Sequence, residues 1–367
     1  MLTDDDIALT LHYGLGVKGS AQLLETFGSA AKIYAAGAER LTAAGLRPEI
    51  AREIAARTKH RQAEAELKFM HRHGIEAVVS TDDDYPELMR MCSDYPHVLY
   101  FMGDRRALSG RRKIAVVGTR AATAYGMNMC ERMIGRLAEL HPEAVVVSGL
   151  AFGIDSCVHR AALDAHLTTI GVIANPLPDV SPAQHQRLAD EIIAAGGAIV
   201  TELHSQTRMN GAYFIPRNRI IAGMSEGCVV VESPNKGGAL TTAEFAYGYD
   251  RSVMAVPGRV TDKCSYGTNR LIAERRAAMV CSAEDIVREL GWDIERPGII
   301  PTRPEPVPTL SGDENLIIAY LRELNTADMD TLIVRTGIPA AQISSILMGL
   351  ELEGLIRSLP GKKYELA

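Results

Sequence analysis

Aromatic residues are scarce in this chain of 367 residues, at 5% of the sequence, and Trp292 is the only tryptophan. A large core must therefore consist mostly of aliphatic side chains. No apolar run approaches the roughly 20 residues that a membrane-spanning helix needs. Residues 1–6 lack both the basic and the apolar parts of a signal peptide. We expect a cytoplasmic protein that does not contact membranes.

Closely spaced cysteines are also absent. No two of the six lie two to four residues apart, so the spacing typical of a structural zinc site is missing. A disulfide framework is not expected in a cytoplasmic chain. We therefore predict no metal and no cofactor. We interpret all six cysteines as small buried hydrophobic residues: Cys92, Cys130, Cys157, Cys228, Cys264 and Cys281.

An excess of positive charge is missing as well. The chain has 39 lysines and arginines against 45 aspartates and glutamates, a formal net charge of −6. This excludes a polycation that binds nucleic acid through its bulk charge. Any nucleic-acid site must be a local concentration of arginine and lysine.

Residue patterns divide the chain into four zones. The pattern of residues 1–75 predicts short helices, one of which ends before Gly28. It also predicts a longer helix from Pro48 to about His71. Residues 76–295 alternate short apolar runs with helical stretches. Five prolines between residues 296 and 309 indicate a linker, because proline is excluded from helix interiors and central strands. Residues 310–367 show the helix and hairpin pattern of a winged helix.

The apolar runs of the second zone are nearly continuous, as expected for parallel strands that are covered on both faces. With helical stretches between them, they predict an α/β fold, a doubly wound and mostly parallel sheet. The predicted strands are Val98–Met102, Lys113–Val117, Ala144–Val147, Thr168–Ile173, Ala198–Leu203, Cys228–Glu232, Ser252–Val256 and Ala278–Cys281.

Open α/β sheets bind ligands beyond the carboxyl ends of their strands, so the turns after these strands are the candidate sites. Gly118, Thr119 and Arg120 follow one strand. A glycine there lets the backbone approach a ligand, and an arginine can clamp a phosphate. The alternative is a tight turn with a surface arginine.

Ser148 and Gly149 follow the next strand, where they either contact a ligand or form a packing turn. Asp155, six residues further on, we interpret as a helix N-cap.

A further candidate lies at the start of an apolar helix, in Arg217, Asn218 and Arg219. Two guanidinium groups beside free N–H groups suit phosphodiesters. The alternative, which we expect for one of the two arginines, is a pair with a carboxylate that braces the sheet.

The last candidate turn is Lys236, Gly237 and Gly238, with Thr241 one turn later. A double glycine that opens a helix behind a lysine is typical of an anion cradle. Glu244 is the only carboxylate placed in such a turn, and no paired carboxylates or Ser/His/Asp set stand beside it. The pattern therefore favours binding over catalysis, and we expect no catalytic residues.

These turns make the chain recognisable. It resembles the DNA-processing protein A (DprA/Smf) family throughout residues 76–290, and the flanking zones resemble that family's helical (sterile-alpha-motif-like or helix-hairpin-helix-like) and winged-helix domains. The motifs that carry the resemblance are Gly118-Thr119-Arg120, Ser148-Gly149-Leu150-Ala151, Pro216-Arg217-Asn218-Arg219-Ile220-Ile221-Ala222-Gly223, Gly238-Ala239-Leu240-Thr241 and Val256-Pro257-Gly258.

The resemblance implies an extended Rossmann-like fold and a homodimer formed through that domain. It implies a protein of natural transformation that binds and protects single-stranded DNA and loads the recombinase RecA. It also implies that Arg120, Arg217 and the turn from Lys236 to Gly238 face the phosphates of the strand.

The chain departs from the family pattern in one loop. Ser181 replaces an aromatic residue and Ala183 replaces a frequent basic one, so His185 and Arg187 are the candidates for that contact. The turn 14–19 (Gly-Leu-Gly-Val-Lys-Gly) either touches DNA backbone, as hairpin modules do, or is a plain interhelical turn.

Two other functions compete with DNA binding. The stretch from Gly237 to Glu244 is similar to the phosphate-binding motif of LOG phosphoribohydrolases, although Lys236 and Leu240 replace a proline and a glycine of that motif. A winged-helix transcription regulator is the other alternative. Residues 310–367 carry fewer basic than acidic residues, and the candidate recognition helix, from residue 340, has no positive charge, whereas groove reading needs cationic donors. We expect this zone to contact protein or to serve packing, rather than to read DNA.

Overall fold

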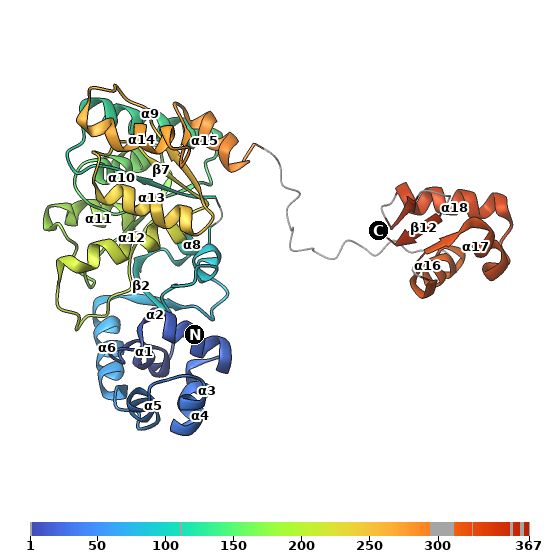
Figure 1. The fold of residues 1–367 in the computed structure, drawn as a ribbon, viewed down its shortest axis with the longest axis horizontal. Helices are drawn as coiled ribbons and strands as arrows, with labels where there is room; N and C mark the ends of the chain where they lie inside the picture. Colours follow the sequence, from blue (N-terminus) through green and yellow to red (C-terminus); the bar gives the residue numbers. More distant parts are fainter. Residues whose placement is uncertain are drawn as a thin grey trace. The chain divides into compact units, whose positions relative to one another are not determined.

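The computed structural model describes residues 2–110, 112–293, 312–324, 326–352, 355–359 and 363–366. The chain divides into two compact units, Met1–Ile294 and Glu295–Ala367 (Figure 1). The stretch 296–309, predicted to be a linker, lies outside the described residues.

Six helices precede the first strand. Gly28 ends α2 with φ of +85°, as its position after the apolar repeat predicted. The single long helix predicted from Pro48 is wrong: the chain leaves the helix after Ala55, and Arg57 adopts a left-handed conformation with φ of +52°. The helices are α1 (Asp4–Thr10), α2 (Gly16–Phe27), α3 (Ala30–Ala35), α4 (Gly37–Ala43), α5 (Pro48–Ala55) and α6 (His60–His73).

A nine-stranded sheet forms the centre of the first unit, in the order β1-β2-β6-β5-β4-β3-β7-β8-β9. The seven strands from β6 to β9 along this order are parallel, and β1 and β2 are antiparallel additions at one edge. The predicted doubly wound, mostly parallel sheet is therefore confirmed, whereas β1 was not predicted. The strands are β1 (Glu76–Val79), β2 (Val98–Gly103), β3 (Lys113–Val117), β4 (Val145–Ser148), β5 (Thr168–Val172), β6 (Ala198–Thr201), β7 (Gly227–Val230), β8 (Ser252–Ala255) and β9 (Ala278–Met279).

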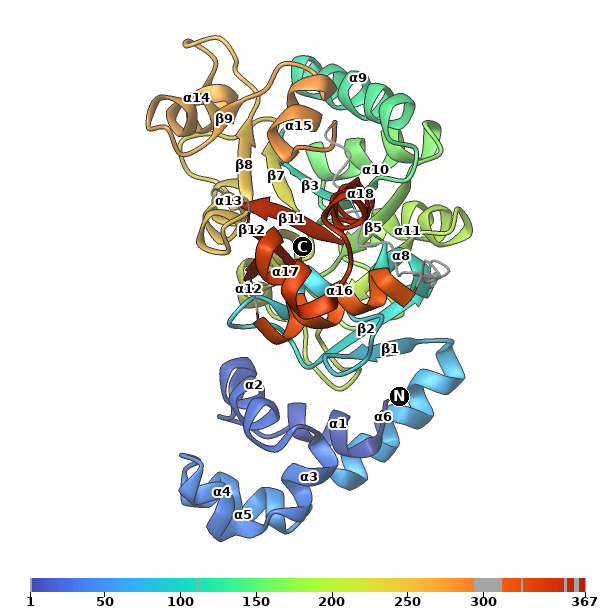
Figure 2. The ribbon, with the colours of Figure 1, turned by 90° about the vertical axis from the view of Figure 1, so that its right-hand side faces the viewer.

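Helices cover both faces of the parallel sheet (Figure 2). Ile114 and Val116 of β3 pack with α9, α10 and α15, and Ala115 and Val117 pack with α12 and α13 on the other face. This alternation explains the nearly continuous apolar strands, since both faces are buried. The helices of this region are α7 (Glu87–Arg90), α8 (Arg105–Ser109), α9 (Ala124–Leu140), α10 (Ile154–Asp164), α11 (Gln186–Ala194), α12 (Phe214–Gly223), α13 (Gly238–Gly248), α14 (Tyr266–Ala273) and α15 (Ala283–Leu290).

The helical segment α1–α6 shares a hydrophobic core with β1, β2 and α11. Buried polar contacts reinforce this junction. His97 Nε2 lies 3.0 Å from Asp6 Oδ1, and the backbone N–H of Ser205 donates to Glu66 Oε1 at 2.8 Å. The helical segment is thus packed onto the antiparallel edge of the sheet.

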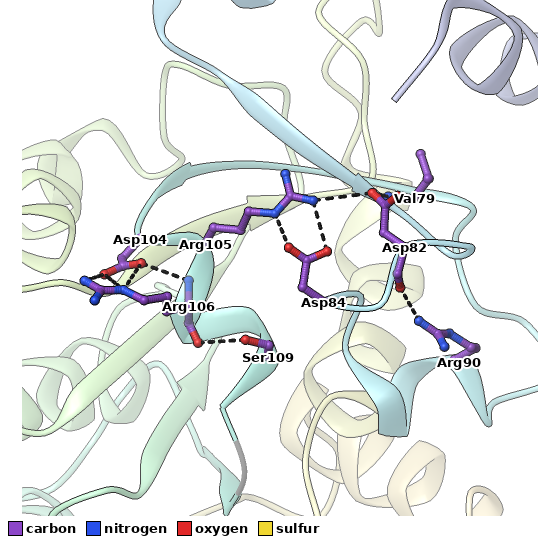
Figure 3. Close-up of polar contacts among 8 residues, drawn as sticks. All are labelled: Val79, Asp82, Asp84, Arg90, Asp104, Arg105, Arg106 and Ser109. Carbon is purple, nitrogen blue, oxygen red and sulfur yellow. Dashed lines mark hydrogen bonds and ion pairs between the residues drawn. The ribbon is translucent and has the colours of Figure 1, made fainter. Parts of the chain in front are cut away.

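An arginine cluster fixes the loop between β1 and β2 beside this edge. Arg105, at the start of α8, binds the carboxylate of Asp84 and reaches Asp82 Oδ2 at 3.4 Å, while Arg90 donates to the Asp82 carbonyl (Figure 3). Hydrogen bonding to Arg105 lowers the pKa of Asp84. These contacts join the loop to the sheet domain.

The second unit has its own core, in which Ile317, Leu321, Leu332, Ile343 and Leu347 are buried. Three helices and a small antiparallel sheet in the order β10-β12-β11 give a winged helix, as predicted. Its elements are α16 (Gly312–Leu324), β10 (Thr326–Asp328), α17 (Met329–Thr336), α18 (Ala340–Leu352), β11 (Ile356–Leu359) and β12 (Lys363–Leu366).

All six cysteines are free, but they are not all buried. Cys92, Cys130 and Cys228 are core residues, as expected. Cys157 and Cys264 are half-buried and Cys281 is exposed, which corrects the prediction for those two groups. These three cysteines lie on helix surfaces or in loops. The distance between cysteines in the sequence, on which the prediction rested, carries no information about their burial.

No single helix within the described ranges is long and apolar enough to span a membrane; α17 and α18 pass that test only together, with a 114° bend between them.

Lys113, the first residue of β3, makes the stability of the first unit depend on pH. Burial lowers the pKa of Lys113 to about 8, with Glu226 opposing the shift. Between this value and the ordinary pKa of about 10.4 the unfolded chain binds the extra proton, so stability rises with pH. Relative to Lys113→Met, the wild-type free energy of unfolding should increase by about 3 kcal/mol across this window. Urea unfolding at a series of pH values measures it.

The matched control is Lys68→Met, which removes an exposed lysine of α6. Its unfolding free energy should follow that of the wild type at every pH. Parallel curves for the wild type and Lys113→Met would contradict the prediction.

Candidate nucleic-acid interface

A cleft of about 500 Å³ opens where the order of the parallel strands reverses. The chain runs outward from β3 through β4, β5 and β6, then returns to the other side of β3 with β7, β8 and β9. At such a switch point the loops after two adjacent strands diverge and leave a crevice. The cleft is lined by residues that follow β3, β4 and β7 and by the first turns of α12 and α13: Val117, Gly118, Thr119, Arg120, Ala151, Asp155, Phe214, Ile215, Arg217, Asn218, Ile221, Ser233, Pro234, Gly237, Gly238, Ala239, Thr241 and Thr242.

Glu232, just beyond β7, fixes the loop that carries Arg120. Its carbonyl accepts from the N–H of Thr119 at 2.8 Å. Its buried carboxylate accepts from the backbone N–H of Thr123 at 2.9 Å and from the Thr123 hydroxyl at 2.6 Å. The loop is thus tied to the neighbouring strand from both ends, although Arg120 itself is exposed.

The guanidinium of Arg120 stands at the mouth of the cleft, 5.4 Å from the ring centroid of Phe214. An arginine over an aromatic face keeps its charge and its outward donors while the ring restricts its motion. Arg120 is therefore an accessible and oriented cation.

Arg217 forms the floor of the cleft rather than an exposed clamp. It is 6% exposed, and its Nη1 donates to the carbonyls of Gly149, at 2.6 Å, and of Val172. Burial lowers the pKa of Arg217 to about 10; Asp155 opposes this and Arg120 adds to it. Arg217 thus supplies positive charge from below while it braces the ends of β4 and β5.

Arg219 is the arginine that pairs with a carboxylate. It is 5% exposed and binds the Glu202 side chain, away from the residues that line this cleft. Burial raises the pKa of Glu202, with Arg219 opposing. Between these two arginines, Asn218 donates from Nδ2 to the carbonyl of Gly238 at 3.2 Å and joins α12 to the turn before α13.

That turn presents the backbone N–H groups of α13 to the cleft. Gly237 is the N-cap residue, and no side chain caps the helix. Lys236 and Gly238 are exposed, and Thr241 lies on the same wall. An uncapped N-terminus beside a lysine has the positive partial charge and free donors that an anion needs.

Besides Arg219 and Lys236, four predicted site residues do not line the cleft: Ser148, Gly149, His185 and Arg187. Ser148 is fully buried and donates to the Val116 carbonyl at 2.6 Å, which fits the packing turn that was the alternative to a ligand contact. His185 is buried with Nδ1 2.8 Å from the Leu150 carbonyl, and Arg187 pairs with Glu191 at 2.9 Å on the surface of α11. Neither lines the cleft. Gly149 does not line it either.

Two of the glycines serve packing. A Cβ on Gly149 would meet Asp155 Oδ2 at 2.6 Å, and one on Gly118 would meet Ile154 Cγ1 at 2.4 Å. Both glycines therefore allow α10 to approach the strand ends, rather than making room for a ligand.

Asp155 and Phe214 are site residues that the sequence did not assign. Asp155 was interpreted as a helix N-cap, but Gly153 is the N-cap of α10, and Asp155 lies in the first turn under the cleft. Burial raises the pKa of Asp155 despite Arg217. Phe214 stood beside the arginine motif, and only the fold brings it under Arg120.

The residues that line the cleft include few groups that could act as an acid, a base or a nucleophile. Among its lining residues, Asp155 is the only carboxylate, and it is buried against Arg217. Glu244 is exposed on α13 and does not line the cleft. The arrangement offers cationic and backbone donors without an acid–base pair, which suits binding of phosphate groups.

The structure is that of a doubly wound α/β protein with a cleft at its switch point, lined by Arg120, Arg217 and the uncapped N-terminus of α13. A family model described as DNA recombination-mediator protein A matches residues 76–291, and one for the DprA winged helix domain matches residues 301–362. The chain belongs to the DNA recombination-mediator protein A (DprA) family.

Full-length relatives support this assignment. The putative DNA processing protein DprA of Mycobacterium tuberculosis is 34% identical over 337 residues, which cover 89% of this chain and 86% of that protein. Protein Smf of Escherichia coli is 32% identical over 308 residues, covering 81% and 79%.

Two solved structures are similar. That of DprA from Streptococcus pneumoniae superposes with a TM-score of 0.68 at 30% identity and covers 78% of this chain and 98% of its own. That of DprA from Helicobacter pylori, described for its single-stranded DNA binding mode, gives a TM-score of 0.53 at 25% identity and covers 60% and 97%.

Gly118 is tightly packed and Gly238 has open space beside it, so we expect opposite effects on stability when each is replaced by alanine. Gly118→Ala should lower the free energy of unfolding by about 1–3 kcal/mol, because the new Cβ overlaps Ile154. Gly238→Ala should leave it unchanged or raise it slightly, since a Cβ there meets only Asn218 Nδ2 at 3.9 Å and alanine favours a helix. Thermal unfolding of both variants measures the difference. Equal stabilities would show that Gly118 is not a packing position.

Proposed function

We propose that this protein binds single-stranded DNA with the cleft between β3 and β7, without hydrolysing or otherwise modifying it. One observation carries the proposal: Arg120, the buried Arg217 and the uncapped N-terminus of α13 line one crevice, and the exposed Lys236 directly precedes the N-cap residue of α13. The DNA-binding relative from Helicobacter pylori supports the choice of ligand.

The shape of the site favours a single strand. The donors line a concave crevice of about 500 Å³, whereas proteins that read duplex DNA insert a projecting helix or ribbon into a groove. A flexible strand can bring a phosphate down to the turn before α13. Phe214 and the exposed Ile215 give a base an apolar surface to pack against.

The phosphoribohydrolase alternative is not favoured. Its motif would need the carboxylate of Glu244 beside the bound ribose phosphate, but Glu244 is exposed outside the cleft. Leu240, where the motif has a glycine, is a buried core residue of α13. Incubation with nucleoside monophosphates should release no free base.

Membership of the DprA family supports a wider role, which we propose in four parts. The proposal includes protection of incoming single strands in natural transformation, delivery of the strand to the recombinase RecA, a homodimer formed through the sheet domain, and a cytoplasmic location. Nuclease protection, co-purification with RecA and sedimentation of the purified chain test these parts separately.

Binding should be independent of sequence and weaken with salt. Because backbone N–H groups and cations make the contacts, the logarithm of the binding constant should fall with log salt by about 0.7 for each phosphate neutralised. Fluorescence anisotropy on oligothymidylate and on a mixed sequence at several salt concentrations measures the slope. Tighter binding to blunt duplex, or no salt effect, would overturn the proposal.

Arg120→Ala should weaken binding of single-stranded DNA more than tenfold, since one charge-assisted contact contributes about 1.5–3 kcal/mol. Arg120→Lys should recover only part of it, because lysine keeps the charge but not the bidentate geometry. The fold should be unaffected, because Arg120 is exposed. Arg106→Ala, which removes an exposed arginine of α8, is the control. Wild-type affinity in Arg120→Ala would remove Arg120 from the interface.

The winged helix should not contribute to DNA affinity. In the sequence, residues 310–367 hold fewer basic than acidic side chains, and α18 has no basic residue. A chain ending at residue 294 should bind oligothymidylate with the affinity of the full chain, and residues 310–367 alone should not bind. A large loss on truncation would assign the domain a DNA contact.

A further inference from the structure

A second cleft, of about 710 Å³, lies between the helical segment and the sheet domain, both within the first unit. One wall is the end of α1 and the first turns of α2, where Gly16 and Val17 belong to the glycine-rich stretch 14–19 that is a candidate for a backbone contact. The other wall is the loop after β6 together with η2, residues 211–213, and the first turns of α12. It is lined by Thr10, Gly16, Val17, Ser20, Pro96, His97, Val98, Glu202, Leu203, His204, Gln206, Thr207, Arg208, Met209, Asn210, Tyr213, Pro216 and Arg219.

The first two turns of α12 separate this cleft from the first one. Phe214, Ile215 and Arg217 line the cleft between β3 and β7, while Pro216 and Arg219, at alternating positions of the same turns, line the second. The two clefts thus share the first turns of α12 as a common wall.

The second cleft holds polar groups without partners. Arg219 is 5% exposed, and although Glu202 occupies its Nη2, its Nη1 has no hydrogen-bond partner. His204 Nδ1 is likewise buried and unpartnered. Buried donors are rarely left unsatisfied, so such groups mark a place where a ligand can bind. Glu202 balances only one arginine, and the exposed Arg208 adds a second positive charge at the rim.

The turn before α2 adds backbone donors on the opposite wall. α2 is twelve residues long, and no side chain caps its N-terminus at Gly16 and Val17. Its free N–H groups and positive dipole suit a phosphate group.

Apolar side chains complete the site. Met209, Tyr213 and Pro216 line the cleft. Met209 is 57% exposed, Pro216 is exposed and Tyr213 is half-buried. Methionine, tyrosine and proline side chains in the lining give a base apolar groups to pack against. Cationic donors on one side and an apolar surface on the other fit a nucleotide.

We propose that the second cleft is a nucleotide subsite for the same single strand, which crosses the start of α12 and places a phosphate between Arg208, Arg219 and the N-terminus of α2. This inference rests on the proposed function. It assigns the glycine-rich turn of the helical segment a direct DNA contact, and Arg219 a role besides its pair with Glu202.

The affinity test compares oligothymidylates of about 4, 8 and 16 nucleotides, because only the longer ones can span both clefts. Arg208→Glu should weaken binding of the longest by about tenfold and leave that of the shortest nearly unchanged. Arg120→Ala should weaken all three. Arg132→Glu, the same charge change at an exposed position of α9 that lines neither cleft, is the control. Equal effects of Arg208→Glu and Arg132→Glu at every length would overturn the second subsite.

A labelling test locates the strand. In Met209→Cys, saturating long oligothymidylate should protect the introduced thiol from a maleimide, read by mass spectrometry of the peptide that contains it, while the exposed Cys281 stays reactive. Full reactivity at position 209 with DNA bound would overturn the subsite but leave the proposed function intact. Protection by thymidine monophosphate but not by the oligonucleotide would instead indicate a free-nucleotide site. If the wild type binds no oligonucleotide, both proposals fail.

Discussion

The arrangement of the elements around the cleft between β3 and β7 depends on the contacts of the buried Arg217 guanidinium. The guanidinium crosses from α12 to the carbonyls at the ends of β4 and β5 and lies over the carboxyl group of Asp155. A charge buried this deeply is tolerated only with hydrogen bonds and a counter-charge around it. Because these partners come from three different segments, the position of α12 on the sheet is fixed, and with it the boundary between the two clefts.

A second constraint lies at Glu232, which holds the loop after β3 in place while the arginine on that loop stays exposed. Its buried carboxylate holds the loop after β3 through Thr123, so that Arg120 can remain exposed without being carried on a mobile loop. Arg120 is therefore exposed, while the carboxylate that holds its loop is buried. Such an arrangement lowers the entropy lost on binding, because the donors need little further ordering.

In the proposed second subsite, the helical segment α1–α6 contributes one wall of a DNA-binding cleft. Its shared core with β1 and β2 and the pair between Asp6 and His97 hold the turn before α2 opposite α12. Residues 310–367 hold fewer basic than acidic side chains, and we expect no contribution from them to DNA affinity. The chain has a negative net charge, but Arg120, Arg208 and Arg219 give the two clefts a local concentration of positive charge.

The sequence by itself determined the doubly wound sheet, the winged helix and the candidate turns, because nearly continuous apolar strands, glycines at strand ends and clustered arginines are local signals. It could not decide which candidates reach solvent. Arg217, Arg219 and Ser148 stand at strand or helix ends like Arg120, yet only Arg120 is exposed, since exposure depends on partners distant in sequence, such as Glu202 and Val116. Tertiary structure alone brought Phe214 under Arg120 and the turn before α2 opposite Arg219, because these contacts join segments that only the packing of helices on the sheet places together.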